Sequence, residues 1–378
     1  MRNFLIAGFI LLVLAVVAVV GFKLIFTERG GSLPGLDTSG RSAAAVPQHL
    51  QALQNGDAAA RKAAAFALWQ IGPYAQDAAP ALLAVASDPD PEVREAVVKA
   101  LGRTAQGNQE AVRRLVEALK DEKGDVRAAA ATALFELWVA EKSSSLPAAS
   151  RQGKTGNPAA TAKPFSPEAE QGVRAAVPVL RKTLKDTDAR ARAQAASALG
   201  EAGALAEPAV PELIEMLRKD PEERARLEAT LALGNTGPAA KAAVPALVDI
   251  LRNEKMLSIR VNAAGSLGQI HCDPDLVVPA LVEAHLKDAE PEVRQWSMIS
   301  LLQFGPEALK RSQAAVQSLA RDPENKKLPD FEKRLASFTA ALERRLKNPG
   351  TSPPAKEPSS GPRGPAPRRN SPAKAPGG

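Results

Sequence analysis

The chain has 378 residues, few of them aromatic (4%), and is dominated by Ala and Leu, a composition that favours closely packed helices over sheets. Its single cysteine, Cys272, excludes an internal disulfide and a cysteine-based metal site. The formal net charge is +7, but Lys347 to Gly378 carries most of it, so the remaining chain is nearly neutral.

Residues 1–27 carry a membrane signal. Phe4 to Phe22 is an uninterrupted apolar run between Arg2 and Lys23, long enough as a helix to cross a hydrocarbon core of about 30 Å. A cleaved signal peptide usually has a shorter apolar core of about 7–15 residues. We therefore expect an uncleaved, single-pass signal anchor that contacts the membrane through residues 4–26. The usual fate of such an anchor places the C-terminal part outside the cytoplasm, and the Gly/Ser/Pro-punctuated residues 28–42 are predicted to be a flexible tether.

Seven helical segments then share a register that is set by one arginine: Arg61, Arg94, Arg127, Arg192, Arg226, Arg260 and Arg294. The steps are 33 or 34 residues, apart from one of 65. An apolar residue precedes each Arg, and a Leu follows it seven positions later, which is the stripe of a helix buried on one side. Two helical patterns per period of this size are typical of an α-solenoid.

The first helices of the pairs carry their own mark, a proline that recurs at a near-constant distance before the Arg. Proline is tolerated in the first turn of a helix, where its missing N–H costs nothing. The six prolines are Pro47, Pro80, Pro178, Pro211, Pro245 and Pro279. The third unit lacks the proline and has Arg113 near that place.

These units resemble HEAT repeats, in particular the shorter kind found in phycobilin lyases and in many bacterial proteins. The matching strings are Pro91-Glu92-Val93-Arg94, Ala100-Leu101-Gly102 and Ala243-Val244-Pro245-Ala246-Leu247. The resemblance implies an all-α fold, an α–α superhelix of the HEAT/ARM-like kind with about seven helix pairs and a C-terminal capping helix. It implies little about chemistry.

The predicted solenoid falls into two blocks, residues 43–141 and 168–320, followed by the capping helix within 321–348. Residues 142–167 are polar, rich in Ser, Gly, Pro and Ala, and predict a flexible insert that could be a hinge or a binding loop. Residues 349–378 are rich in Pro and basic residues, and predict a disordered tail.

The repeated Arg is expected to pair with an acidic residue of a neighbouring unit and so to link the repeats. The candidates are the acids four residues before it: Asp57, Asp90, Asp188, Glu222 and Glu290. This ladder is favoured over a ligand-binding role.

No catalytic, metal or cofactor site is predicted. Deoxyhypusine hydroxylases, a HEAT-fold enzyme class, bind iron through His-Glu pairs, but Glu follows none of His49, His271 and His285. His271-Cys272-Asp273 offers too few ligands for a metal and is interpreted as a polar turn.

The residue nine positions after each Arg is always polar, and in this family that row lies on the concave face. We call it the polar row: Gln70, Arg103, Glu136, Glu201, Asn235, Gln269 and Gln303. Its charges cancel, which suits a protein or peptide better than nucleic acid. Trp296 lies outside the core stripe and is a candidate anchor, with packing under the C-terminal cap as the alternative. Trp138 is expected to seal the end of the first block.

The hypothesis is therefore a non-enzymatic, membrane-anchored scaffold that binds a protein or peptide partner through the polar row and Trp296, with no cofactor and no evident small-molecule substrate. An ordinary solvated face is the alternative for that row. An accessory or lyase-like factor of the phycobilin-lyase type is the first alternative function. Contact of the basic tail with nucleic acid or an anionic surface is the second.

Overall fold

The computed structural model describes residues 43–144 and 165–347, and in these ranges the chain forms helices and no strand. The predicted anchor, tether and tail, and residues 145–164 of the predicted insert, lie outside the described residues. Within the described ranges, each helix is either too short or too polar to cross a lipid bilayer.

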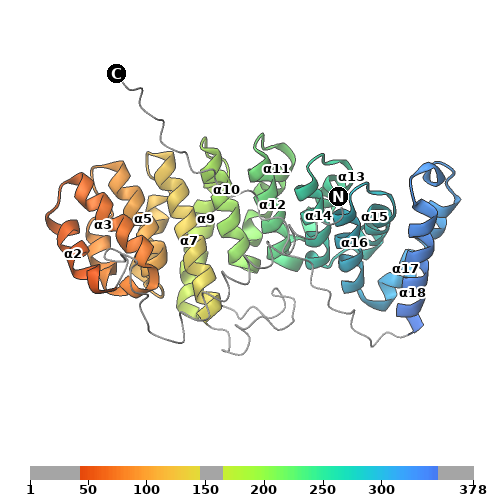
Figure 1. Cartoon of the computed structure of the whole chain (residues 1–378), viewed down its shortest axis with the longest axis horizontal. Helices are drawn as coiled ribbons and strands as arrows, with labels where there is room; N and C mark the ends of the chain where they lie inside the picture. Colours follow the sequence, from red (N-terminus) through yellow and green to blue (C-terminus); the bar gives the residue numbers. More distant parts are fainter. Residues whose placement is uncertain (1–42, 145–164, 348–378) are drawn as a thin grey trace, which may run out of the picture. The chain divides into compact units, whose positions relative to one another are not determined.

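Seven helix pairs follow one another along the chain, in the order that the arginine register predicts (Figure 1). The first helices are α2 (Val46–Asn55), α4 (Ala79–Ala84), α6 (Gln109–Ala118), α9 (Pro167–Thr183), α11 (Val210–Lys219), α13 (Val244–Asn253) and α15 (Pro274–Lys287). The second helices are α3 (Ala58–Ile71), α5 (Pro91–Thr104), α7 (Gly124–Ser144), α10 (Ala189–Ala202), α12 (Glu223–Thr236), α14 (Leu257–Ile270) and α16 (Pro291–Gln303). Short 3-10 turns lie between or before some of them: η1 (Ala43–Ala45), η2 (Gly72–Ala78), η4 (Gly203–Ala209) and η5 (Gly237–Ala243).

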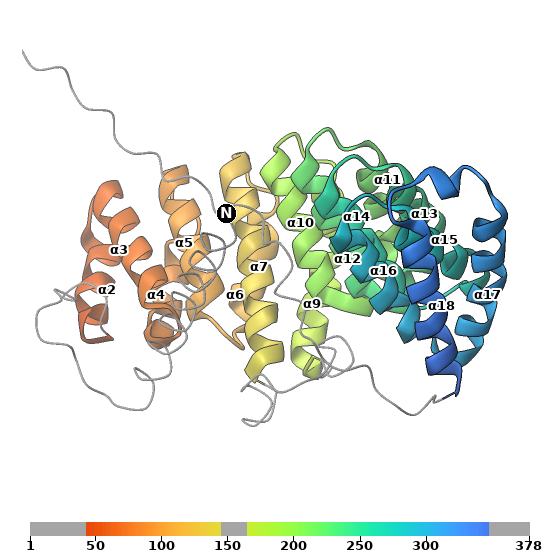
Figure 2. The ribbon, with the colours of Figure 1, turned by 45° about the vertical axis from the view of Figure 1, so that its right-hand side comes forward.

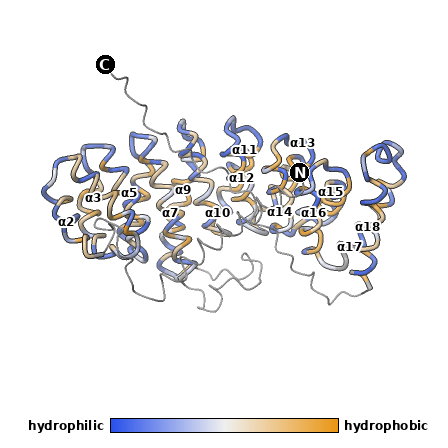
Figure 3. The backbone as a smooth tube through the Cα atoms, in the orientation of Figure 1, coloured by the Kyte–Doolittle hydropathy of each residue, from blue (hydrophilic) through white to orange (hydrophobic). Residues whose placement is uncertain are grey.

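Each second helix packs against the second helix of the next pair, from α3 through to α16 (Figure 2). The leucine seven positions after each Arg has no exposed surface in any of the seven pairs: Leu68, Leu101, Leu134, Leu199, Leu233, Leu267 and Leu301. Figure 3 shows hydrophilic residues at the turns along the upper edge and hydrophobic residues along the helices between them. The apolar stripe read from the sequence is therefore the core of the stack.

The helix ends have local causes. Asp57, Asp90 and Asp188 each accept a hydrogen bond from a backbone N–H of the first turn that follows, at 2.8 Å. At the other end, Gly203 closes α10 with φ +60°, a conformation that an L side chain rarely adopts. His271, which follows α14, also has a positive φ (53°) although it is not a glycine.

The two blocks meet without a break in the packing. α7 continues to Ser144, into the predicted insert, and packs directly on α10. Trp138 is 2% exposed and meets Phe165 edge to face, with ring centroids 6.4 Å apart. The second helices therefore stay in contact across the position of the predicted insert.

The C-terminal end departs from the repeat. α17 (Gly305–Arg321) is a full helix that the sequence pattern does not single out, and it is followed by η6 (Asn325–Lys327) and by the predicted capping helix, α18 (Phe331–Lys347). Phe331, Phe338 and Leu342 of α18 are buried. α18 packs mainly on α15 and α17 rather than on α16 (Figure 2).

Candidate functional site

The repeated arginine forms a ladder between consecutive units. Arg94 donates from Nε and Nη2 to the two carboxylate oxygens of Asp121, at 2.7 and 3.0 Å. Its Nη1 donates to the backbone oxygen of Asp88, at 2.9 Å, so that one side chain binds its own turn and the next. Six such pairs are present in the described residues: Arg61–Asp88, Arg94–Asp121, Arg127–Asp186, Arg192–Asp220, Arg226–Glu254 and Arg260–Asp288.

The ladder is as expected, but the predicted carboxylates are wrong. The acid that pairs lies six residues before the next Arg, not four. Asp57, Asp90 and Asp188 instead cap the second helices, whereas Glu222 and Glu290 make no side-chain cap. The three aspartates four positions before the Arg are used at the start of their own helix, whereas the carboxylate six positions before it reaches back to the preceding unit.

In four of the six ladder pairs the pKa of the carboxylate lies below its usual value: Asp88, Asp121, Asp186 and Asp220. The hydrogen bond from Arg61 lowers the pKa of Asp88 against the opposing effect of burial. Burial alone would raise the pKa of Asp186, but the hydrogen bonds from Arg127 and from the backbone N–H of Asp188 bring it below its usual value. These arginines therefore have a stacking role, and their positive charge is already compensated.

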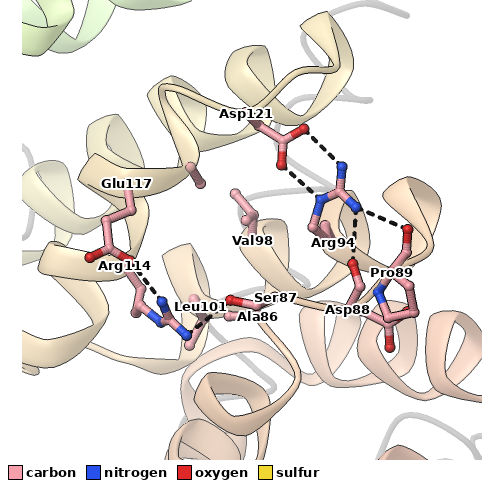
Figure 4. Close-up of a pocket in the computed structure, with 11 residues that line it drawn as sticks. Ala86, Ser87, Asp88, Pro89, Arg94, Val98, Leu101, Arg114, Glu117 and Asp121 are labelled. Carbon is pink, nitrogen blue, oxygen red and sulfur yellow. Dashed lines mark hydrogen bonds and ion pairs between the residues drawn. The ribbon is translucent and has the colours of Figure 1, made fainter.

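A cavity of about 370 Å³ lies between two rungs of the ladder (Figure 4). Arg94 lies on one wall, bound to Asp121, and Arg114 on the other, bound to Glu117 at 2.7 Å and to the Ser87 hydroxyl at 3.0 Å. Both guanidinium groups already have carboxylate partners. The cavity is therefore a gap in the turn edge of the stack, and no member of the polar row lines it.

The polar row lies on the second helices as expected, and its members are half-buried or exposed. Their surroundings divide the row into two parts. Gln70, Arg103, Glu136 and Glu201 belong to the first four units, and Asn235, Gln269 and Gln303 to the last three.

In the first part, three of the four side chains interact with neighbouring groups. Arg103 donates to the backbone oxygen of Trp69 at 3.1 Å and lies over its ring, 5.2 Å from the centroid. Burial raises the pKa of Glu136, which the charge of Arg103 partly offsets. Lys142 pairs with Glu201 at 3.3 Å. For Gln70, which is half-buried, the structure gives no interaction of this kind.

In the second part, the row lies over glycines of the preceding second helix. A Cβ atom on Gly234 would be 2.4 Å from Oε1 of Gln269, and one on Gly268 would be 2.7 Å from Oε1 of Gln303. Asn235 and Gln303 are exposed. This end of the row therefore presents uncharged amide groups.

Two further apolar side chains, which the arginine register does not single out, accompany the row on the same face. Phe66 and Leu231, five positions after their Arg, are 49% and 36% exposed. Gly265 has the same position in α14, and Trp296 of α16 lies over it, with ring atoms 3.6 and 3.8 Å from where a Cβ would be. Phe66 and Leu231 can be found in the sequence as large apolar residues four positions before a member of the polar row.

The histidine candidates have structural surroundings. His271 stacks on Phe304, with ring centroids 4.5 Å apart, and Asp273 pairs with Lys241 at 3.2 Å. Cys272 is a half-buried free thiol. In the ranges that the structure describes, no three His, Cys, Asp or Glu side chains are grouped as metal ligands would be.

The comparison with protein families agrees with this architecture. The family model of HEAT repeats matches residues 46–134, 168–234 and 210–302, more than half of the chain. Two crystal structures of engineered proteins are similar, one at 22% identity and TM-score 0.41 over 68% of this chain and 96% of that one. The other has 20% identity and TM-score 0.37 over 80% and 92%. None of the curated proteins matches. The chain belongs to the HEAT repeat family.

Proposed function

We propose that the protein is a non-enzymatic scaffold that binds a protein or peptide partner on the second helices of its last three units. The binding patch comprises Leu231 and Asn235 on α12, Gln269 on α14, and Trp296 on α16. The observation that carries the proposal is that Leu231 is exposed on α12 while Trp296 lies over the bare backbone of Gly265 on α14, so that apolar surface is present on both sides of α14.

The chemistry of the patch suits a polypeptide. An indole and a leucine side chain supply apolar surface, and indole groups are frequent anchors in protein interfaces. The amides of Asn235 and Gln269 can both donate and accept, as a peptide backbone requires. No lysine or arginine belongs to this patch, which disfavours a nucleic-acid backbone.

The proposal includes a membrane anchor. The apolar run from Phe4 to Phe22 would hold the solenoid at a membrane, with the HEAT repeats outside the cytoplasm, as in an anchored bacterial protein. Such a tether raises the effective concentration of the patch near membrane partners.

Two leucines allow a matched test. Leu231 on α12 and Leu276 on α15 are nearly equally exposed, at 36% and 39%, but lie on a second and a first helix. Membrane preparations are crosslinked to the full-length protein and to its L231E, W296A and L276E variants, and the captured proteins are quantified by mass spectrometry. We expect at least one partner to be lost with L231E and W296A and retained with L276E.

Other results would overturn the proposal. Equal capture by all four proteins would reject the patch. Bound pigment in purified protein would favour the lyase-like alternative. Nucleic-acid binding that disappears with residues 349–378 and depends steeply on salt would favour the tail.

A further inference from the structure

The repeated arginine of the last unit, Arg294, lacks the ion pair that the six earlier arginines make. Nη1 of Arg294 donates to the backbone oxygens of Asp288 and Ala289, at 2.9 and 2.7 Å, as its equivalents do in the inner units. In the six inner units the arginine also binds a carboxylate in the turn of the following unit, through Nε, Nη2 or both. Within residues 43–144 and 165–347, no carboxylate pairs with Arg294.

The carboxylate that the register assigns to this rung is present in the sequence but is not used. Asp322 follows Arg294 at the spacing of 28 that joins Arg192 to Asp220 and Arg260 to Asp288. Asp322 is exposed, and its Oδ1 accepts from the backbone N–H of Glu324 at 3.0 Å.

The capping helix lies close to Arg294 but supplies no carboxylate to it. α18 packs mainly on α15 and α17, and its Arg334 donates from Nε to the backbone oxygen of Leu286, at 2.8 Å. Burial lowers the pKa of Arg334, and the positive charge of Arg294 lowers it further, against the opposing charge of Asp330. The end of the ladder therefore has two neighbouring guanidinium groups where an inner unit has an arginine and a carboxylate.

The side of α16 beyond this rung is apolar. Positions four and eight after the Arg face the next second helix: a Cβ on Gly102 would be 2.7 Å from Cβ of Ala133 in α7. In α16 these positions are Met298 and Leu302, both half-buried. In inner units position four is fully buried, as in Ala131, because the next second helix covers it.

We propose that the outer side of α16 and the guanidinium of Arg294 form a docking site for a helical segment of a partner protein, whose preceding turn supplies a carboxylate. Charge complementarity supports this occupant, since the free fork of Arg294 matches the carboxylate geometry of the inner rungs. The apolar side chains of Met298 and Leu302 supply the area that a helix would cover.

The α7–α10 step shows what such an occupant looks like. α7 carries Phe135, a large residue, eight positions after its Arg, as α16 carries Leu302. The helix that packs on α7 is α10, rich in alanine, and its preceding Asp186 binds Arg127. Small residues on the docking helix accommodate the large residue on the other side.

This helix provides the probe. A fluorescein-labelled peptide of residues 184–204, held helical by a staple on its outward side, is titrated into the full-length protein in detergent micelles. The control peptide carries Asp186→Asn. We expect saturable binding of the first peptide by fluorescence anisotropy, about tenfold tighter than that of the control, which corresponds to about 1.4 kcal/mol.

Variants of the full-length protein assign the site. R294Q should bind both peptides with equal, weak affinity, and M298E should bind neither. R321Q, an exposed arginine of α17, and L276E serve as matched controls and should bind as the wild type does. Circular dichroism and the melting temperature establish that each variant is folded.

The site is independent of the binding patch, so L231E should leave the affinity for the peptide unchanged. Equal binding of the two peptides by the wild type, or binding that R294Q leaves unaltered, would overturn the proposal. A doubling of the molecular mass that M298E abolishes would overturn it too, because the occupant would then be a second copy of this chain.

Discussion

At the scale of single residues, Ser297 is out of place in the core. It lies three positions after Arg294, its side chain has no exposed surface, and its hydroxyl has no hydrogen-bond partner. The inner units have an apolar residue there: Ala64, Val97, Ala130, Ala195, Ala229 and Ala263. A buried hydroxyl without a partner costs about 1–3 kcal/mol.

We therefore expect Ser297→Ala to raise the free energy of unfolding by about 1 kcal/mol, measured by urea denaturation. Ser300→Ala is the matched control and should lower it, because the Ser300 hydroxyl donates to the backbone oxygen of Ala264 at 2.7 Å. A destabilised S297A would show that the Ser297 hydroxyl has a favourable role in the core.

His285 makes the docking of α18 sensitive to acid. Nδ1–H of its ring donates to the backbone oxygen of Arg294 at 2.8 Å, and the ring packs on Phe338 with centroids 5.0 Å apart. Burial lowers the pKa of His285, and the charges of Arg294 and Arg334 lower it further, while the hydrogen bond opposes them. The folded protein therefore binds this proton less readily than the unfolded chain, whose histidine pKa is about 6.5.

It follows that stability contributed by neutral His285 is complete above about pH 6.5 and declines as the pH falls below it, towards the lower folded pKa. We expect the melting temperature to fall between pH 7.5 and pH 5.5, and to fall less in H285Q, whose side chain stays neutral. Identical pH profiles of the two proteins would show that His285 does not contribute.

At the scale of the helix, close approach between neighbours depends on glycine at some steps and not at others. A Cβ on Gly102 would be 2.6 Å from Cα of Ala133, a backbone atom that moves only with α7. A Cβ on Gly265 would be 3.6 Å from the Trp296 ring, an ordinary contact.

Gly102→Ala should therefore destabilise the protein by about 1–3 kcal/mol, because the overpacking outweighs the gain in helix propensity. Gly265→Ala should be neutral or stabilising by up to about 1 kcal/mol. Urea denaturation of both variants checks the contrast, and equal effects would mean that α5 and α7 adjust without cost.

Helix pairs were predictable because each one repeats the same apolar stripe, so seven segments support one register. The carboxylates of the ladder were not predictable, because a turn such as 88–90 holds two acidic residues. A single sequence does not tell which of the two caps a helix and which binds the arginine of the neighbouring unit. The polar row was located correctly on the second helices. Its division into two parts depends on contacts such as Lys142–Glu201, which join residues 59 positions apart.

At the scale of the whole stack, the α7–α10 seam differs from the other steps in its covalent connection. Elsewhere a short turn and one first helix join consecutive second helices, whereas here residues 145–164 lie between α7 and α9 as well. A longer connection raises the entropy cost of bringing the two sides together. Coupling across this step therefore depends on helix packing and on ion pairs between the two helices. The least exposed of these pairs is Arg127–Asp186, in which Nη2 of Arg127 lies 2.6 Å from Oδ1 of Asp186.

Arg127→Ala should therefore loosen the coupling between residues 43–144 and 165–347. Removing Arg127 leaves the half-buried Asp186 with only its hydrogen bond from the backbone N–H of Asp188, which costs about 1–3 kcal/mol. In a stack with nearest-neighbour coupling, a weakened interface lets its two sides unfold separately. We expect thermal unfolding of R127A, followed by calorimetry, to separate into two transitions. Arg192→Ala breaks the equivalent bond to Asp220 inside the second block, where the connection is short, and should lower the melting temperature without that separation. Two transitions in both variants would show that the extra residues have no part in the effect.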